Sequence, residues 1–335
     1  MHEHPSQPKW APTRRDVLAA VLCGVASTRA GSIFAADPWP AKPVRIVVPF
    51  APGGGADTAA RVLAEMFAPQ LGQSVVVENK PGAGGAIGVT IVVQAKDQHT
   101  LLMGSNSLLI APILNPTLPY EAARDFDVIG MATANPLVLV VPATSKLSSV
   151  KDVIDSARGE AGKLTAGNSG NGTLAHLTAE LFSLQTGVSF TNVPYKGESA
   201  LMPDLISGLV ALGFLNLPSV IAHIRSGRLR ALAVSGAQAS ADLPGVNTLK
   251  TLGYPEFEVQ AWAGLLAPKG VPPEGLAKLE SALAKAMASE VVKKRFLAAG
   301  LTPFALERGA AQKHLATEAA NWQQVIKTRG IKADT

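Results

Sequence analysis

The segment VRIVVPFAPGGGADT, residues 44–58, decides the fold class of this 335-residue chain. The apolar, β-branched run Val44–Val48 predicts a buried strand, and the apolar spacing over residues 56–71 predicts a helix. Gly53–Gly55 join the two elements, and we expect Asp57 to cap the helix through its side-chain oxygen. Glycines at a helix start let the backbone approach a ligand, and the unpaired N–H groups there favour an anion. The segment therefore predicts an anion-binding βα unit.

A second glycine-rich loop, AGNSGNGT at residues 166–173, directly precedes a helical stretch over Leu174–Leu184. Ser169, Asn171 and Thr173 have side chains that can donate hydrogen bonds beside this helix start. Such a mixture suits a carboxylate, which accepts up to four hydrogen bonds. A chain with two such loops and no catalytic constellation is typical of an anion receptor.

Short β-branched runs alternate with longer helical ones along the chain, which predicts an α/β protein with largely parallel sheets. The length is sufficient for two domains. We expect a first lobe of residues 39–142 plus 261–331 and a second lobe of residues 143–260. Two extended crossings, Leu137–Val141 and Ala261–Leu265, are expected to form the hinge. The C-terminal helices are expected to pack on the first lobe.

The composition excludes two broad classes of protein. A hydrophobic fraction of 47% with only 16% charged residues excludes a disordered chain. The net charge of +5 is modest, and the basic residues of the first 36 positions account for part of it. Because the remaining charge is small and scattered, we expect no nucleic-acid partner.

Residues 1–36 have the pattern of a bacterial export signal, so we expect the mature protein in the periplasm. The pair Arg14–Arg15 resembles a twin-arginine signal, although the general secretory route stays open. The uncharged stretch Val17–Thr28 is far shorter than the roughly 20 residues that span a membrane. Cys23 is the only cysteine and lies inside this signal, preceded by Leu22 rather than the small residue of a lipoprotein site. The mature chain then has neither disulfides nor cysteine chemistry.

Enzyme signatures are incomplete in this sequence. Gly170-x-Gly172-x-x-Ala175 fits the relaxed dinucleotide fingerprint, but Phe190-Thr191-Asn192 stands where the acidic residue should follow. We find no G-x-S-x-G elbow, no phosphate-binding loop and no paired metal-ligand histidines. We therefore expect no cofactor, no metal and no enzymatic activity. The alternative is an exported hydrolase or isomerase that uses the cleft between the two expected lobes.

Several motifs in order resemble the Bug family, the substrate-binding proteins of tripartite tricarboxylate transporters. They are Pro49–Gly55, Val77–Gly85, Pro119–Tyr120, Gly170–Thr173 with His176, Val193–Gly197 and Leu265–Pro268. The resemblance covers Trp39–Ile331. It implies a two-lobed periplasmic binding protein of type II, in which each lobe is a mainly parallel sheet flanked by helices and two strands form the hinge.

The resemblance also implies a small carboxylate ligand, delivery to membrane permease subunits, and a monomer. It places ligand contacts at Phe50, Gly54, Gly55, Ser105, Ser169, Asn171, Thr173 and Tyr195. A receptor that signals to a sensor kinase would use the same residues, and the sequence does not separate the two roles.

Two departures from the family pattern concern specificity and surface structure. Relatives often carry an acidic residue before the equivalent of Asn216, where this chain has Leu215. If that acid meets an ammonium group, its loss predicts a carboxylate without an amine, with an apolar body against Leu215. Lys96–Thr100 also differs from the usual Pro-Asp-Gly-Tyr-Thr, and we expect a surface turn of little consequence there.

Overall fold

The computed structural model describes residues 39–159 and 162–332. The predicted export signal, with Cys23 and the paired arginines, lies outside these residues. None of the described helices combines the length and the hydrophobicity needed to cross a membrane.

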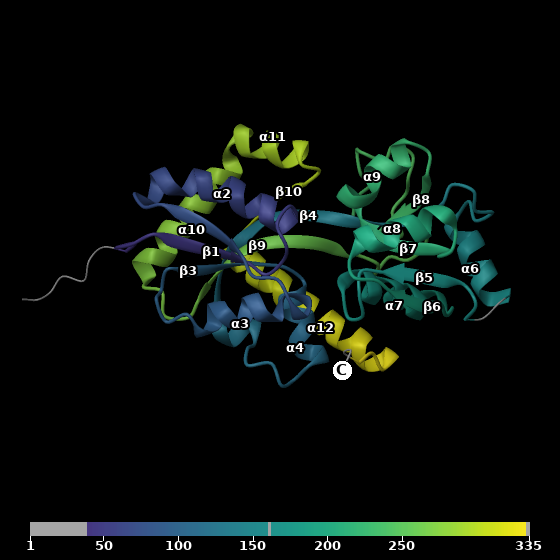
Figure 1. The fold of residues 1–335 in the computed structure, drawn as a ribbon, viewed down its shortest axis with the longest axis horizontal. Coiled ribbons are helices and arrows are strands. Elements are labelled where there is room, and N and C mark those ends of the chain that lie inside the picture. Colours follow the sequence, from purple (N-terminus) through teal and green to yellow (C-terminus); the bar gives the residue numbers. More distant parts are fainter. Residues whose placement is uncertain (1–38, 160–161, 333–335) are drawn as a thin grey trace, which may run out of the picture. The chain divides into compact units, whose positions relative to one another are not determined.

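Three parallel strands, in the order β2-β1-β3, form the first parallel set. They are β1 (Val44–Val48), β2 (Val75–Asn79) and β3 (Thr100–Gly104). Helix α2 (Gly55–Leu71) follows β1, and the short turn η1 (Ala83–Gly85) with α3 (Ala86–Gln94) follows β2. Ile46 packs in the core with α2, whereas Val47 packs in the core with α3. The two helices therefore cover opposite faces of the set (Figure 1), and this explains why β1 is apolar at every position except Arg45.

A second parallel set has the order β6-β5-β7. Its strands are β5 (Thr165–Asn168), β6 (Thr191–Pro194) and β7 (Leu212–Asn216). The helices of this region are α6 (Val150–Gly159), α7 (Leu174–Thr186), α8 (Glu198–Ser207) and α9 (Leu217–Arg225), and strand β8 (Leu229–Val234) follows them. Leu177 and Phe182 of α7 lie in one core cluster, and Leu201 and Leu205 of α8 lie in another.

Two long antiparallel strands connect the two sets: β4 (Phe126–Pro142) and β9 (Gln260–Pro268). Strand β9 pairs with β3, and the first part of β4 also pairs with β10 (Pro303–Glu307). The last part of β4 pairs with β7 and β8. Along β4, pairing with β9 ends at Pro136 and pairing with β7 begins at Leu137. The predicted crossings 137–141 and 261–265 lie next to this change of partner. The sequence pattern did not predict the first eleven residues of β4.

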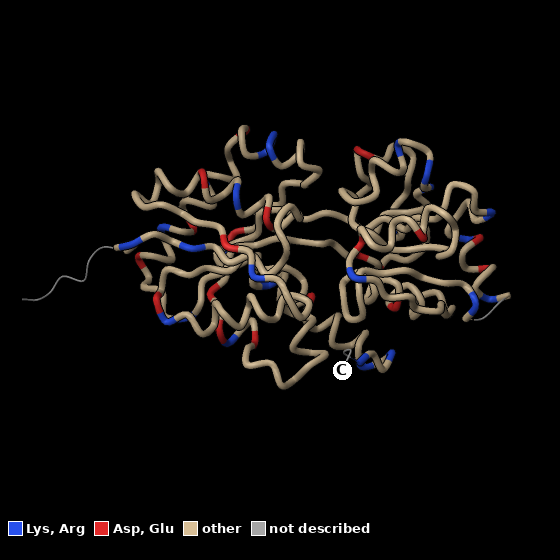
Figure 2. The backbone as a smooth tube through the Cα atoms, viewed as in Figure 1, with Lys and Arg blue, Asp and Glu red and all other residues tan. Residues whose placement is uncertain are grey.

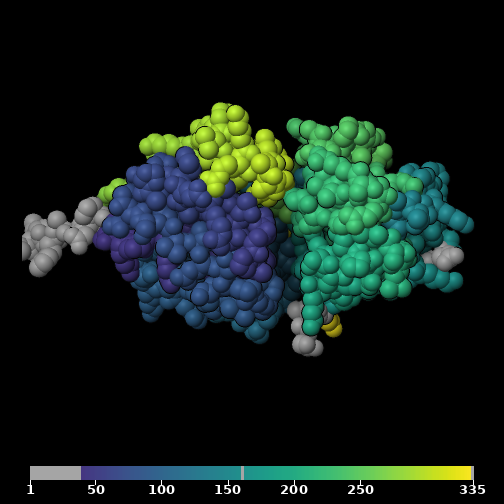
Figure 3. Space-filling model, turned by 45° about the horizontal axis from the view of Figure 1, so that its top comes forward, coloured from purple at the N-terminus to yellow at the C-terminus, as the bar shows by residue number. Residues whose placement is uncertain are grey.

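The remaining helices differ in which core they cover. Helix α10 (Pro273–Ala288) and α11 (Glu290–Ala298) pack on α2, and Figure 3 shows this yellow-green segment against the purple and blue surface. Helix α12 (Arg308–Arg329) packs on α4 (Ser107–Leu114) and also on α7. Ala311 and Leu315 lie in the core that contains α3, whereas Trp322 and Ile326 lie in the core of the second set. Helix α12 thus belongs to both cores, which we did not expect.

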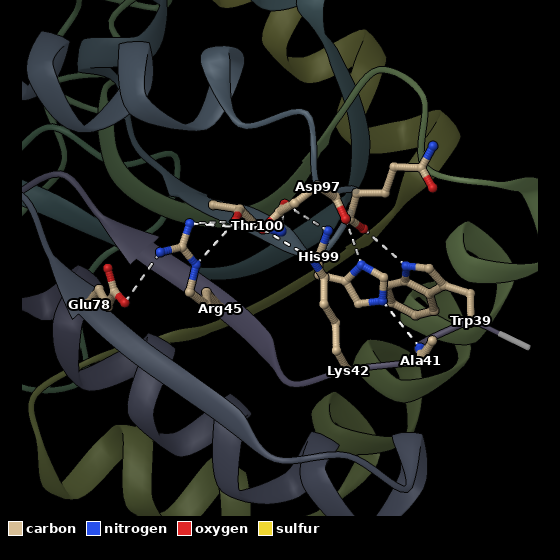
Figure 4. A network of polar contacts seen from close by, with 9 residues as sticks. Trp39, Ala41, Lys42, Arg45, Glu78, Asp97, His99 and Thr100 are labelled. Carbon is tan, nitrogen blue, oxygen red and sulfur yellow. Dashed lines mark hydrogen bonds and ion pairs between the residues drawn. The ribbon is translucent and has the colours of Figure 1, made fainter. Parts of the chain in front are cut away.

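The Lys96–Thr100 segment is a turn, as predicted, but its side chains hold two strands together (Figure 4). Asp97 accepts hydrogen bonds from the backbone N–H groups of His99 and Thr100. Arg45 of β1 donates to Thr100 Oγ1 of β3 at 2.8 Å. The His99 ring stacks on Trp39, with 5.6 Å between ring centroids. This network joins the amino ends of β1 and β3, so the expectation of little consequence was wrong.

Charged residues are spread along the whole described chain (Figure 2). Many of them form ion pairs, such as Arg295 with Glu65 at 2.6 Å and Arg308 with Asp127 at 2.9 Å. The absence of a nucleic-acid partner stays a prediction.

Candidate functional site

Three loops meet at the carboxyl ends of the first parallel set. A Cβ atom placed on Gly85 would lie 2.9 Å from Ser107 Oγ and 3.4 Å from Phe50 Cζ. Ser105 Oγ in turn lies 3.1 Å from Ser107 Oγ. The loops that follow β1, β2 and β3 therefore contact one another, and the φ of +101° at Gly85 is a conformation that favours glycine.

Gly54 and Gly55 form the exposed start of α2. Gly54 is the N-cap residue with a φ of −79°, and no side chain of the described residues caps this end of the helix. The first N–H groups of α2 are consequently available to an external acceptor, and the helix dipole favours negative charge there.

Asp57 holds this glycine loop in place from the third position of the helix. Its side chain is 5% exposed and accepts hydrogen bonds from Gly53 N at 2.9 Å and from Asn79 Nδ2 at 2.9 Å. Arg61 Nε donates to the same carboxylate at 3.0 Å. Burial alone would raise the pKa of Asp57, but the hydrogen bonds from Arg61, Gly53 and Asn79 outweigh it and lower the pKa. Asp57 therefore supports the glycine loop through Gly53 and does not cap the helix, so the expectation of a cap was wrong.

The second glycine loop is shaped by hydrogen bonds among its own residues and by one from Asn192 of β6. Thr173, the N-cap residue of α7, donates from Oγ1 to Gly170 O at 2.7 Å and accepts from Ser169 Oγ at 3.2 Å. Asn171 Oδ1 accepts a hydrogen bond from Asn192 Nδ2 at 2.6 Å. No side chain in the described part of the chain caps the first turn of α7. The start of α7 therefore resembles that of α2.

Tyr195 follows β6 and lies beside this loop. A Cβ atom on Gly170 would lie 3.5 Å from Tyr195 O. The phenol donates its proton to Asp204 Oδ2 at 2.7 Å. Burial and this acidic neighbour raise the pKa of Tyr195 to about 12. The hydroxyl group thus donates its proton to Asp204, and only the phenol oxygen, as an acceptor, and the ring are available to a ligand.

The two specificity candidates occupy different environments. The Leu215 side chain is fully buried among apolar residues of α8 and α9, so it has no surface for a ligand in this structure. Asn216, at the carboxyl end of β7, donates from its backbone N at 3.0 Å and its Nδ2 at 2.8 Å to Glu198 Oε1. Burial raises the pKa of Glu198, while hydrogen bonds from Ser219 and Asn216 lower it in part.

Sequence reasoning missed Glu198, although its place at the first position of α8, after Tyr195–Gly197, was a usable signal. Asn216 Oδ1 is buried and has no hydrogen-bond partner among the described residues. Asn216 therefore remains a candidate ligand contact, whereas the buried Leu215 does not.

The predicted residues thus fall into two groups. Phe50, Gly54, Gly55 and Ser105 belong to the loops of the first parallel set, and Ser169, Asn171, Thr173 and Tyr195 belong to those of the second. Helix α4, which begins at Ser107, connects the groups: a Cβ atom on Gly172 would lie 2.4 Å from Leu114 Cδ1 at its end.

A cavity of about 740 Å³ lies elsewhere, between α7, α12 and residues 255–260, and none of the predicted residues lines it. No cluster of three or more His, Asp or Glu within residues 39–159 and 162–332 is arranged to hold a metal.

Two parallel sets with glycine loops at their carboxyl ends, joined by long antiparallel strands, define the fold of periplasmic binding proteins. The model of the tripartite tricarboxylate transporter family receptor, TctC, matches residues 59–331, and the chain belongs to this family of receptors. This confirms the resemblance to Bug proteins drawn from the sequence motifs.

Similar proteins include two whose structures were solved with adipate or malate. Protein BugT of Bordetella pertussis is 38% identical over 319 residues, which cover 94% of this chain and 98% of BugT. The structure of Rpa4515 of R. palustris with adipate has a TM-score of 0.78 and 32% identity, and it covers 88% of this chain and 100% of that one. MatC of Rhodopseudomonas palustris with bound malate has a TM-score of 0.75 and 28% identity, covering 86% of this chain and 100% of MatC.

Proposed function

We propose that this chain is an extracytoplasmic receptor that binds a small organic carboxylate without an amine and delivers it to a membrane permease. The ligand is held between the starts of α2 and α7, by backbone N–H groups, by hydroxyl groups of the surrounding loops and by bridging water. The proposed contacts are Phe50, Gly54, Gly55, Ser105, Ser169, Asn171, Thr173, Tyr195 and Asn216.

One observation carries this proposal. Each parallel set presents a glycine-rich loop that opens a helix whose first turn has no cap from a described side chain. A carboxylate can accept hydrogen bonds from such a helix start, each contributing about 1.5–3 kcal/mol when charge-assisted. A handful of these bonds, after entropy losses, corresponds to a dissociation constant on the order of micromolar.

The relatives support the ligand class. Rpa4515 was solved with adipate and MatC with malate, and both ligands are dicarboxylates without an amine. The acid that contacts Asn216 here, Glu198, already accepts hydrogen bonds from the backbone and side chain of that residue. Glu198 thus fixes Asn216, and the amine-free ligand class is supported by the two relatives.

The mechanism we propose is closure of two lobes, residues 39–142 plus 261–331 and residues 143–260, about strands β4 and β9. Strand β4 pairs with β7 of the second set and with β9, which in turn pairs with β3 of the first set, and this supports the division. A ligand bound to one helix start gains its remaining hydrogen bonds only when the second lobe closes. The closed monomer, without any cofactor, is the form delivered to the permease.

Calorimetric titration of the periplasmic protein with succinate, malate, adipate and aspartate tests the proposal. We expect binding of at least one amine-free dicarboxylate, and malate bound more tightly than its amine analogue aspartate. Recovery of the ligand unchanged after prolonged incubation separates a receptor from the alternative, an exported hydrolase or isomerase. Binding of aspartate in preference to malate would contradict the ligand class.

A further inference from the structure

Glu318, in the middle of α12, is an acid that the proposed ligand contacts do not include. Its side chain is only 14% exposed. Oε1 accepts hydrogen bonds from Asn106 Nδ2 at 2.6 Å and from Trp322 Nε1 at 2.9 Å, and Oε2 accepts one from Trp262 Nε1 at 2.6 Å. His314 Nε2 lies 3.8 Å from Oε2. One carboxylate thus joins α12, the loop after β3 and strand β9.

Asn106, one partner of Glu318, lies in the loop after β3, between Ser105, a proposed ligand contact, and Ser107. The residue is 5% exposed, and its Nδ2 donates a second hydrogen bond to Gln260 O at 2.9 Å. Its Oδ1 accepts a hydrogen bond from the backbone N of Trp262 at 3.2 Å. Both polar atoms of the amide are therefore fixed, and their partners all lie in β9 and α12.

Because the Glu318 carboxylate is buried, the hydrogen bonds that it accepts depend on one another. Burial raises the pKa of Glu318, while the hydrogen bonds from Trp322, Asn106 and Trp262 lower it in part. Losing one donor would leave a poorly solvated carboxylate short of a partner. A displacement of Asn106 is thus expected to move the carboxylate and both indole groups with it.

We propose that Glu318 is a positioning residue that holds the Ser105–Ser107 loop in its ligand-binding form and couples ligand contact at this loop to strand β9 at Gln260. The inference rests on the proposed function, because ligand contact at Ser105 is part of that proposal. Gln260 is the first residue of β9, so a shift at the loop reaches this strand at its start.

The two indole N–H groups on Glu318 supply a direct readout. We would follow the ¹⁵N-labelled indole signals of the periplasmic protein during titration with malate, assigning them by Trp→Phe variants. The signals of Trp262 and Trp322 are expected to shift together and to saturate with the calorimetric dissociation constant. Trp39 donates to Gln98 O instead, at 3.0 Å, and its signal is expected to stay in place.

Glu318→Gln replaces one acceptor oxygen by a donor group. Both indole signals are then expected to move without ligand, and the affinity for malate is expected to fall at least fivefold. Glu290→Gln is the matched control, because Glu290 is exposed on α11 and pairs only with Lys293 among the described residues. It should leave the indole signals and the affinity unchanged.

The outcomes separate the two claims. If malate binds by calorimetry but the signals of Trp262 and Trp322 stay fixed, or if Glu318→Gln binds malate as tightly as the wild type, the inference is overturned and the proposed function stands. If no carboxylate binds, both are overturned. Should Glu318→Gln fail to fold, Trp262→Phe removes one donor and keeps an aromatic ring. Weaker malate binding in that variant supports the inference, and unchanged affinity overturns it.

Discussion

The Asp57 carboxylate accepts a hydrogen bond from the backbone N–H of Gly53 at 2.9 Å, across the turn that opens α2. The acid thereby fixes the glycine loop while leaving the N–H groups at the helix start without a side-chain cap. An anion site built from backbone groups needs such a support, because glycines have no side chains to pack. The loop is therefore held by a residue of the first turn of α2 whose side chain does not cap the helix.

Asp57→Asn should weaken this support. One acceptor oxygen becomes a donor group, so either Asn79 Nδ2, which donates to Oδ1, or both Gly53 N and Arg61 Nε, which donate to Oδ2, lose their acceptor. We expect the free energy of unfolding to fall by about 1–3 kcal/mol, together with a weaker affinity for carboxylates, as measured by urea denaturation and calorimetry. Asp242→Asn is the control, because its ion pair with Arg225 is exposed on both sides. Equal effects of the two substitutions would argue against the role of Asp57.

The same residue predicts a pH dependence of stability. The pKa of Asp57 is lowered in the folded protein, so its stabilising contribution is present above the ordinary value of 3.8 and is lost as pH falls below it. The difference in melting temperature between wild type and Asp57→Asn should be constant from about pH 5 to 7 and shrink below about pH 4. Thermal melts across this range measure it. A difference that persists undiminished at pH 3 would contradict the assignment.

Gly85→Ala should disturb the point where three loops meet. The new Cβ would lie 2.9 Å from Ser107 Oγ, on a backbone with a φ of +101°. Gly187→Ala, at a φ of +69° with no atom within 4 Å of the new Cβ, carries backbone strain without the clash. We expect both variants to lose about 1–2 kcal/mol of stability, and only Gly85→Ala to lose carboxylate affinity in calorimetry. Loss of affinity in both variants would point to a general effect of strain.

Tyr195→Phe tests how the tyrosine takes part in binding. Because the phenol donates to Asp204, it has no proton left for a carboxylate, and its ring remains for contact. We expect a loss of stability of about 1 kcal/mol and a change in affinity of no more than about threefold. A tenfold loss of affinity at unchanged stability would show instead that the hydroxyl contacts the ligand.

Much of the fold was predictable from local sequence signals. The parallel strands and the helices after them follow from β-branched runs, helical spacing and glycine loops, and the helix predicted over residues 56–71 is α2, which spans Gly55–Leu71. Helix α4 was missed because the segment after Gly104 is short and contains Pro112. The first part of β4 was missed because Gly130 and Asn135 interrupt its apolar pattern, and long-range pairing with β9 and β10 overrides that local signal.

The site was less predictable, because side-chain partners far apart in sequence determine it. The position of Leu215 suggested contact with a ligand, but the structure buries this side chain with residues of α8 and α9. Glu318 gave no motif at all: its partners Asn106 and Trp262 lie 212 and 56 residues away. Pairings of this kind depend on the assembled fold, and periodicity or spacing does not encode them.

The most direct test of the central claim compares the wild type with Gly54→Ala in calorimetric titrations with malate. Gly54 has a φ of −79°, and a Cβ there would lie 3.9 Å from its nearest neighbour, Ala51 O, so the fold accepts alanine. If the helix start of α2 binds the carboxylate, wild type binds malate with a dissociation constant on the order of micromolar. Gly54→Ala then binds at least tenfold more weakly at an unchanged melting temperature, while Gly309→Ala, which also has open space, binds like the wild type. Equal affinities of wild type and Gly54→Ala, or no malate binding by either, would contradict the account.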